Sequence, residues 1–190
     1  FLISENAIAY QEDDIMAALT YARLAAFQLN DIPLSICLPL GTNSGAHLGI
    51  SPLAIYCNDI NRLFHTVLSV AAGNEGNERL HYAGNMAEEE DATEVEFNVA
   101  EGQEALVLEF WGDAPTTFAV GLVSPQGDRI ERIPPRFGQE EVLQLPLANS
   151  TIYIAYQMIE TFSGDELVFI RITNPIAGLW KLLMSADEGR

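Results

Sequence analysis

The sequence predicts a partial parallel α/β layer followed by an antiparallel β-sandwich or jelly roll. The expected fold class is therefore α/β plus all-β. Residues 1 to about 85 alternate helical and strand-like patterns in the order helix, strand, helix, strand, which favours parallel strands. Beyond residue 85 the helical period disappears, and about eight short strand-like segments follow, separated by turn residues. We expect an α/β segment at residues 1–87, a sandwich at 88–184 and a tail at 185–190.

The first expected helix begins with an acidic turn and continues as an apolar stripe. Glu12, Asp13 and Asp14 suit the positive end of the helix dipole, and apolar side chains then recur near the helical period as far as Phe27. After a turn comes the short apolar run at residues 34–38, which is typical of a parallel strand covered on both faces.

The second expected helix delivers the chain to a second strand. Ser51 is a suitable N-cap, Pro52 suits the first helical position, and apolar side chains continue to Phe64. Residues 66–72 then read as a strand parallel to the first. In such a sheet ligands bind beyond the carboxyl ends of the strands, so the loops at residues 39–49 and 73–77 are the places where chemistry is expected.

The expected strands of the sandwich cover residues 94–99, 105–111, 117–124, 129–133, 141–145, 151–159, 166–173 and 179–184. Trp111 and Trp180 lie on two of these strands. Tryptophans there can line a carbohydrate groove, but in a sandwich they are more typical of the core, which is where we expect them.

The charge of the chain excludes several functions. Lys and Arg number 9 against 27 Asp and Glu, which gives a formal net charge of −18. Such a chain repels phosphate backbones and anionic lipid surfaces, so we expect no nucleic-acid partner. No apolar run approaches the roughly 20 residues that a membrane helix needs, and the N-terminus lacks the basic flank of a signal peptide, so we expect no membrane partner.

No metal or cofactor is expected. The spacing of cysteines and histidines does not match a zinc site. The run Glu88-Glu89-Glu90-Asp91 offers oxygen ligands for calcium, but a contiguous acidic run is more typical of a solvated loop. Cys37 and Cys57 fall in a predicted strand and a predicted helix, which favours reduced thiols in the core over a disulfide.

The loop after the second strand carries the strongest chemical signal. In Ala71-Ala72-Gly73-Asn74-Glu75-Gly76, small residues let the backbone turn sharply, and a side-chain amide stands at the tip. An uncharged amide with two N–H donors suits the stabilisation of a transient oxyanion. The alternative is a Gly-Asn turn in which Asn74 only caps the backbone.

This segment resembles the oxyanion-hole segment of the subtilisin-like serine proteases. The resemblance implies that Asn74 donates its amide to the tetrahedral intermediate and that Gly73 allows close approach. Upstream, residues 36–41 resemble the strand that pairs with the substrate backbone, so that Leu40 and Gly41 line the substrate edge. Pro39 departs from the usual Ser of this segment and has no N–H to offer the substrate.

Within that family the chain is similar to the clostridial-type subtilases, among them the spore-germination proteases. Residues 40–47 and 74–82 carry this narrower resemblance. In that group a jelly roll is inserted between the oxyanion segment and the nucleophile, and residues 95–111, 123–127 and 178–180 resemble parts of such an insert. The resemblance covers nearly the whole chain. It implies a bacterial protein and leaves its location open between the spore and the exterior.

Subtilases order their triad as Asp, His, Ser along the chain, and the oxyanion Asn lies between the last two. The sequence holds no Asp-Thr-Gly, His-Gly-Thr-His or Gly-Thr-Ser-Met-Ala motif, so it fits an internal fragment between the catalytic His and Ser. The start at Phe1 agrees with this expectation. Ser44 is not expected to be the nucleophile, because Asn43 interrupts the motif. We expect His47 and His81 in loops or interfaces and His65 at the end of a helix.

These observations favour a fragment of a serine endopeptidase that acts through an acyl-enzyme, with a protein or peptide substrate and the rest of the parent domain as partners. Exposed sheet edges also predict self-association. A competing hypothesis is a non-catalytic binding module in a pseudoprotease, in which the sandwich recognises a peptide, a sugar or a protein. A further alternative is a purely structural insert.

Overall fold

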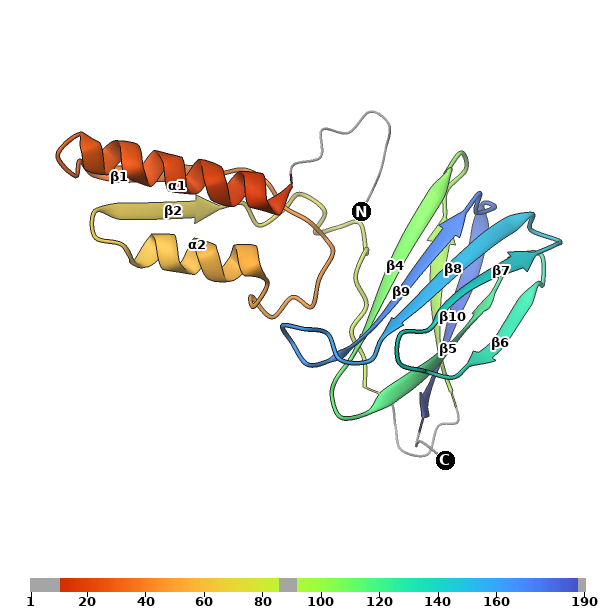
Figure 1. The fold of residues 1–190 in the computed structure, drawn as a ribbon. Coiled ribbons are helices and arrows are strands. Elements are labelled where there is room, and N and C mark those ends of the chain that lie inside the picture. The colour runs from red at the N-terminus through yellow and green to blue at the C-terminus, as the bar shows by residue number, and fades with distance from the viewer. Residues whose placement is uncertain (1–10, 86–91, 188–190) are drawn as a thin grey trace. The chain divides into compact units, whose positions relative to one another are not determined.

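The computed structural model describes residues 11–85 and 92–187, and the described residues fall into two compact units, one ending at Tyr82 and one beginning at Ala83 (Figure 1). The domain boundary expected after residue 87 lies outside the described residues, as does the acidic run at residues 88–91. Each unit is described by itself below.

The first unit is built from α1 (Glu12–Gln28), β1 (Leu34–Leu38), α2 (Pro52–Arg62) and β2 (Thr66–Val70). β1 and β2 pair in parallel, from Leu34 with Thr66 to Leu38 with Val70, which confirms the predicted order and direction. α2 begins as predicted, because the Ser51 hydroxyl accepts a hydrogen bond from the Ala54 N–H at 3.2 Å and Pro52 follows the cap.

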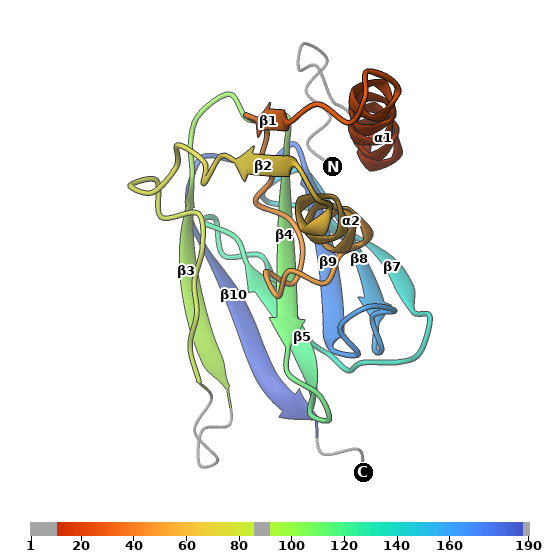
Figure 2. The same ribbon diagram turned by 90° about the vertical axis from the view of Figure 1, so that its left-hand side faces the viewer.

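Both helices lie on one face of the two-stranded sheet (Figure 2). Along β1 the half-buried side chains of Leu34, Ile36 and Leu38 alternate with the exposed Ser35 and Cys37. The prediction that this strand is covered on both faces is therefore wrong for the described residues. Cys37 is exposed instead of lying in the core for the same reason: no described element of this unit covers its face of the sheet.

The second unit consists of two antiparallel sheets with the strand orders β3-β10-β5-β6 and β4-β9-β8-β7. The strands are β3 (Thr93–Val99), β4 (Ala105–Gly112), β5 (Thr117–Val123), β6 (Arg129–Ile133), β7 (Glu140–Leu145), β8 (Ser150–Gln157), β9 (Glu166–Thr173) and β10 (Gly178–Asp187). Val120, Leu122 and Trp180 from the first sheet share one buried cluster with Ile154 and Ile170 from the second. The shared core makes this unit a β-sandwich.

The strand pairing joins the beginning of the sandwich to its end. The first two strands of the sandwich pair with its last two in different sheets, β3 with β10 and β4 with β9. The middle strands instead pair with their neighbours in sequence, β5 with β6, β7 with β8 and β8 with β9. The expected tail at residues 185–190 begins too early, because Ser185 and Asp187 still pair with Ala119 and Thr117 and extend β10.

The two tryptophans differ in their surroundings. Trp180 is fully buried, its ring stacks on Phe97 with centroids 6.2 Å apart, and its indole N–H donates to the Ile176 carbonyl at 2.9 Å. Trp111 is half-buried and donates to the Glu109 carboxylate at 3.1 Å. The core prediction is confirmed for Trp180 and wrong for Trp111, whose strand neighbours Phe110 and Leu108 carry the core face of β4.

A buried phenol joins the two sheets. The Tyr156 hydroxyl donates to the Ile133 carbonyl at 2.7 Å and accepts from the Val120 N–H at 3.1 Å. Burial raises the pKa of Tyr156 above its ordinary value, so the hydroxyl keeps the proton that it donates. Tyr156 comes from β8 in one sheet, whereas Val120 and Ile133 belong to β5 and β6 in the other.

We predict that Tyr156→Phe lowers the free energy of unfolding of the sandwich by about 1–3 kcal/mol, because it leaves a buried N–H and a buried carbonyl without this partner. Urea unfolding followed by tryptophan fluorescence measures this, since both tryptophans of the sequence lie in the sandwich. Tyr153→Phe, on the same strand but half-buried, is the control and should cost less than about 1 kcal/mol. Equal losses in the two variants would contradict the assignment.

Candidate functional site

The parallel pairing of β1 with β2 brings two loops to one edge of the sheet. Leu38 and Val70 end the register together, and the Ala71 N–H continues the pairing by donating to the Leu38 carbonyl at 3.1 Å. The chain therefore leaves the sheet at the same edge in both loops, at residues 39–50 and 71–82. This is the carboxyl edge, where ligands of parallel sheets bind.

Local hydrogen bonds fix the loop that carries Asn74. Gly73 has a φ of +87°, a left-handed conformation, and a Cβ there would lie 3.0 Å from Glu75 Oε2. That same carboxylate oxygen accepts the Asn74 backbone N–H at 2.9 Å, and the Glu75 carbonyl accepts the Glu78 N–H at 2.9 Å. The Glu75 contact shapes the turn around Asn74 and could not be predicted from the sequence.

Asn74 is exposed, and none of the residues that the structure describes hydrogen bonds to its side-chain amide. The backbone cap in this turn is made by Glu75. Both amide N–H groups of Asn74 are thus free to donate to an acceptor from outside, which is what an oxyanion-stabilising group must do.

The first loop carries the residues expected at the substrate edge. Leu40 is half-buried, Gly41 is exposed, and a Cβ on Gly41 would meet no atom within 4 Å. Pro39 is exposed and offers no N–H. Ser44 is also exposed; its backbone N–H donates to the Thr42 hydroxyl at 3.1 Å, and among the described residues no histidine contacts its hydroxyl.

Two histidines connect the loops. The rings of His47 and His81 meet edge to face with centroids 5.0 Å apart, and His47 Nε2 lies 3.2 Å from the Asn43 carbonyl oxygen. Both were expected in loops or interfaces, and both lie in loops. Their contact could not be foreseen, because it joins segments of irregular backbone for which the sequence pattern predicts no geometry. It connects the loop of Leu40 and Gly41 to the loop of Asn74.

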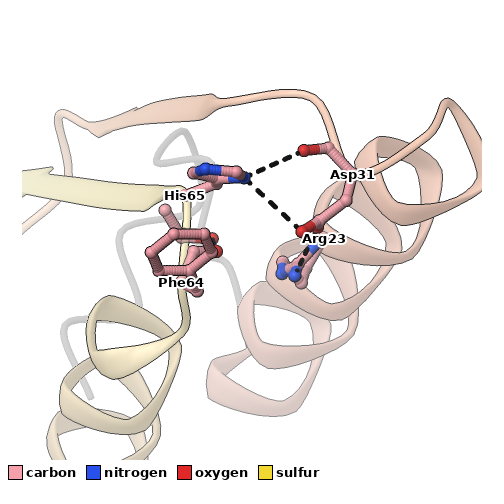
Figure 3. A network of polar contacts seen from close by, with 5 residues as sticks. Arg23, Asp31, Phe64 and His65 are labelled. Carbon is pink, nitrogen blue, oxygen red and sulfur yellow. Dashed lines mark hydrogen bonds and ion pairs between the residues drawn. The ribbon is translucent and has the colours of Figure 1, made fainter.

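A polar network at the opposite edge of the sheet could be mistaken for a catalytic pair (Figure 3). His65 Nδ1 lies 3.2 Å from the Asp31 carbonyl oxygen and 3.5 Å from its carboxylate, while Arg23 Nη2 lies 2.7 Å from the same carboxylate. The Phe64 ring lies on the imidazole, with centroids 4.0 Å apart. These residues join the turn after α1 to the turn before β2.

Several features favour a structural role for this network. Arg23 already compensates the Asp31 charge, and Asp31 and His65 precede β1 and β2, so they lie at the amino edge of the sheet. Ser35 borders a shallow concavity together with His65, but the described residues contain no hydrogen bond between the two side chains. A nucleophile and base need that contact. His65 follows α2 closely, as expected.

The two cysteines, Cys37 and Cys57, are free thiols. Burial, together with the nearby Glu12 carboxylate, raises the pKa of Cys57, which keeps it as the thiol and lowers its reactivity at neutral pH. Among the described residues no three His, Cys, Asp or Glu side chains gather in a way that could hold a metal ion. Within the same residues, neither helix is long and apolar enough to cross a membrane.

No family model matches the sequence, and no curated protein matches it. Among solved structures, the chain is similar to the CspB protease of Clostridium perfringens, with a TM-score of 0.83 and 24% sequence identity. The match covers 100% of this chain but only 40% of that protein, so this chain spans less than half of its length. The likeness establishes a shared fold.

We predict that Gly73→Ala speeds hydrogen exchange at the Asn74 amide by about fivefold or more, because a left-handed alanine costs about 1–2 kcal/mol and its Cβ would crowd the Glu75 carboxylate. Exchange followed by NMR on the labelled chain measures this. Gly76→Ala is the matched control in the same loop, since its Cβ would meet nothing within 4 Å and its φ is not positive. Similar exchange in both variants would contradict this account.

Proposed function

We propose that this chain is a segment of a longer subtilisin-like serine endopeptidase, which hydrolyses peptide bonds through an acyl-enzyme. In this proposal the chain supplies the oxyanion donor and the substrate edge, and the Asp, His and Ser of the triad come from other parts of the parent protein. The observation that carries the proposal is the likeness in fold to a protease, which extends over 100% of this chain at a TM-score of 0.83.

The geometry around Asn74 supports its role as the oxyanion donor. A neutral amide stands just beyond a parallel strand, its residue is exposed, and the described residues leave both of its N–H groups without an internal acceptor. A fixed donor of this kind stabilises the negative oxygen of the tetrahedral intermediate without reorganisation. Gly73 would let the scissile carbonyl approach closely, since it carries no Cβ.

Leu40 and Gly41 are proposed to line the substrate edge. They follow β1 at the same edge of the sheet as Asn74. A substrate strand laid here would lose one backbone hydrogen bond at Pro39, because proline has no N–H. We therefore propose that the substrate is held mainly by carbonyl acceptors and by side-chain contacts at this edge.

The open face of the first unit supports a larger parent sheet. Val67 lies on this face, beside the exposed Ser35, and is 56% exposed. Elsewhere in the unit Phe64 and Val70 are 75% and 55% exposed. An isolated two-stranded sheet is marginal in water, so this layer needs covering elements and further strands. We propose that the rest of the parent subtilase domain supplies them and that the sandwich is a jelly-roll insert.

In the parent enzyme, Asn74→Ala is expected to lower kcat by about 100- to 1,000-fold with little change in KM, the loss known for the corresponding donor of a subtilisin. Steady-state kinetics on a peptide substrate measure both constants. Asn77→Ala, an exposed residue in the same loop, is the control and should leave kcat nearly unchanged. An Asn74 variant with unchanged kcat would remove the assignment.

The 190-residue chain alone is expected to self-associate, because its apolar face and strand edges are open. Sedimentation velocity at rising concentration should show increasing mass. Val67→Lys, on the open face of β2, should reduce association, whereas Val142→Lys, on the sandwich and at least as exposed, should not. A chain that stays strictly monomeric at high concentration would contradict this expectation.

A second candidate function is that of a binding module in a pseudoprotease. The closed core of the sandwich favours this candidate, because that unit buries its own apolar residues without the α/β layer. The two candidates differ in the flanking sequence of the parent. Asp and His motifs upstream and a Gly-Thr-Ser motif downstream would support the protease. Their loss would support the module.

Trimming residues 94–181 from the parent and measuring activity beside melting temperature would reveal a purely structural insert.

A further inference from the structure

One row of side chains crosses the outer face of the second sheet. Glu140 on β7 pairs with Ala155 on β8, Ala155 pairs with Phe169 on β9, and Phe169 pairs with Glu109 on β4. The residues next to them in sequence, such as Ile154 and Leu108, point into the core, so this row faces away from it. The row places a carboxylate at each end and an aromatic ring beside a small residue in between.

A hollow of about 220 Å³ opens on this row. It is lined by Gln139, Glu140, Ala155, Gln157, Leu167 and Phe169, among others, and we call it the Glu140 pocket. Its volume lies below the roughly 300 Å³ at which small-molecule sites begin, so it suits a single side chain better than a whole ligand. The methyl group of Ala155 leaves room that a larger residue would fill.

The lining combines an apolar wall with negative and amide oxygens. Phe169 and Leu167 form the wall, while Glu140 and Gln157 belong to the exposed rim. The Phe169 ring is held by an edge-to-face contact with Tyr153 at a centroid distance of 6.2 Å. Burial, and then the neighbouring Glu140 carboxylate, raises the pKa of Tyr153, so this phenol stays protonated beside the carboxylate.

This combination fits a side chain with an apolar stem and a cationic end. The stem of lysine or arginine can pack on Phe169 and Leu167, and its charge can meet the Glu140 carboxylate and the face of the aromatic ring. The net charge of −18 attracts a cation and repels an anion over longer distances. Arg171 is exposed on the same strand as Phe169 but does not line the hollow.

A neutral sugar would use the pocket less completely. Stacking of sugars favours several exposed rings. Of the two aromatic residues that line the hollow, Phe169 lies on the outer face, whereas Tyr156 is buried with its hydroxyl engaged in the core. A hydroxyl group also leaves the Glu140 charge uncompensated, whereas an ammonium or guanidinium group neutralises it.

We propose that the Glu140 pocket binds a lysine or arginine side chain from a basic segment of a partner protein. The site lies within the sandwich and contains no residue of the candidate oxyanion or substrate-edge loops. It therefore holds whether or not the parent hydrolyses peptides. In a protease it would give the enzyme a docking point for basic proteins.

The test is an NMR titration of the ¹⁵N-labelled 190-residue chain with Nα-acetyl-lysine amide and, separately, with Nα-acetyl-arginine amide. Saturable shifts are expected at the backbone amides of Ala155, Gln157 and Phe169. Glu140→Gln should weaken binding by about three- to tenfold, the range for a partly exposed charge pair. Glu131→Gln, an exposed carboxylate on β6 in the other sheet, is the matched control and should change it by less than about twofold.

A second pair of variants adds a charge instead of removing one. Gln157→Lys places a cation at the pocket and should abolish binding. Gln144 is exposed on β7, on the same face of that strand as Glu140 but outside the lining, so Gln144→Lys should not abolish binding. The proposal is overturned if those amides show no saturable shifts, if norleucine amide binds as well as lysine amide, or if Glu140→Gln and Glu131→Gln behave alike. Saturation by chitotriose in place of the cations would identify a glycan site and would also overturn it.

Discussion

The parallel pairing of β1 with β2 is the constraint on which the candidate site depends. Parallel neighbours need a crossover, and α2 provides it between the two strands. Because Leu38 and Val70 end the register together, the loops of Gly41 and Asn74 begin side by side. Antiparallel pairing would have sent these two loops to opposite edges, and no substrate could then touch both near the sheet.

The same pairing leaves the first unit incomplete. Two strands with helices on one face bury few large side chains, and the described core residues of this unit are Leu19, Ala26, Ile60 and Thr66. The sandwich differs, since residues from both of its sheets reach zero exposure, among them Val120, Ile152 and Trp180. A layer that cannot close its own core belongs next to other elements, whereas the sandwich can retain its fold through its own packing.

Segments with a regular hydrophobic pattern could be predicted from the sequence, because the pattern shows which side chains are buried. Capping predicts the start of α2 at Ser51-Pro52, and the helix between the strands predicts the direction of β2. Alternation of apolar residues predicts the core position of Trp180. Features that depend on a distant partner could not be predicted. Cys37 was expected to be covered because its strand is apolar, but exposure is set by which neighbouring elements are present.

The candidate site shows the same division. Residue types and a preceding strand place an amide at the tip of the loop at Asn74, while its role as a donor follows from the resemblance and stays a prediction. The Glu75 carboxylate on the Asn74 N–H, the contact between His47 and His81, and the outward position of Trp111 each require a specific backbone path or register. A slip of the strand register by one residue moves every side chain to the other face of the sheet, and no residue next to Trp111 in the sequence determines the register.

Glu75 also bears on whether such an acidic chain can stabilise negative charge. Its carboxylate is one residue from the proposed donor, and the chain as a whole carries a net charge of −18. Distant charges are screened beyond about 10 Å at ordinary ionic strength, so most of them have little effect at the loop. A carboxylate at about 4 Å costs about 1 kcal/mol in bulk water and about 4 kcal/mol near a protein surface, whereas an oxyanion donor contributes about 3–4 kcal/mol. The local amide therefore outweighs the adjacent carboxylate only where Glu75 stays directed to the Asn74 backbone and water screens its charge.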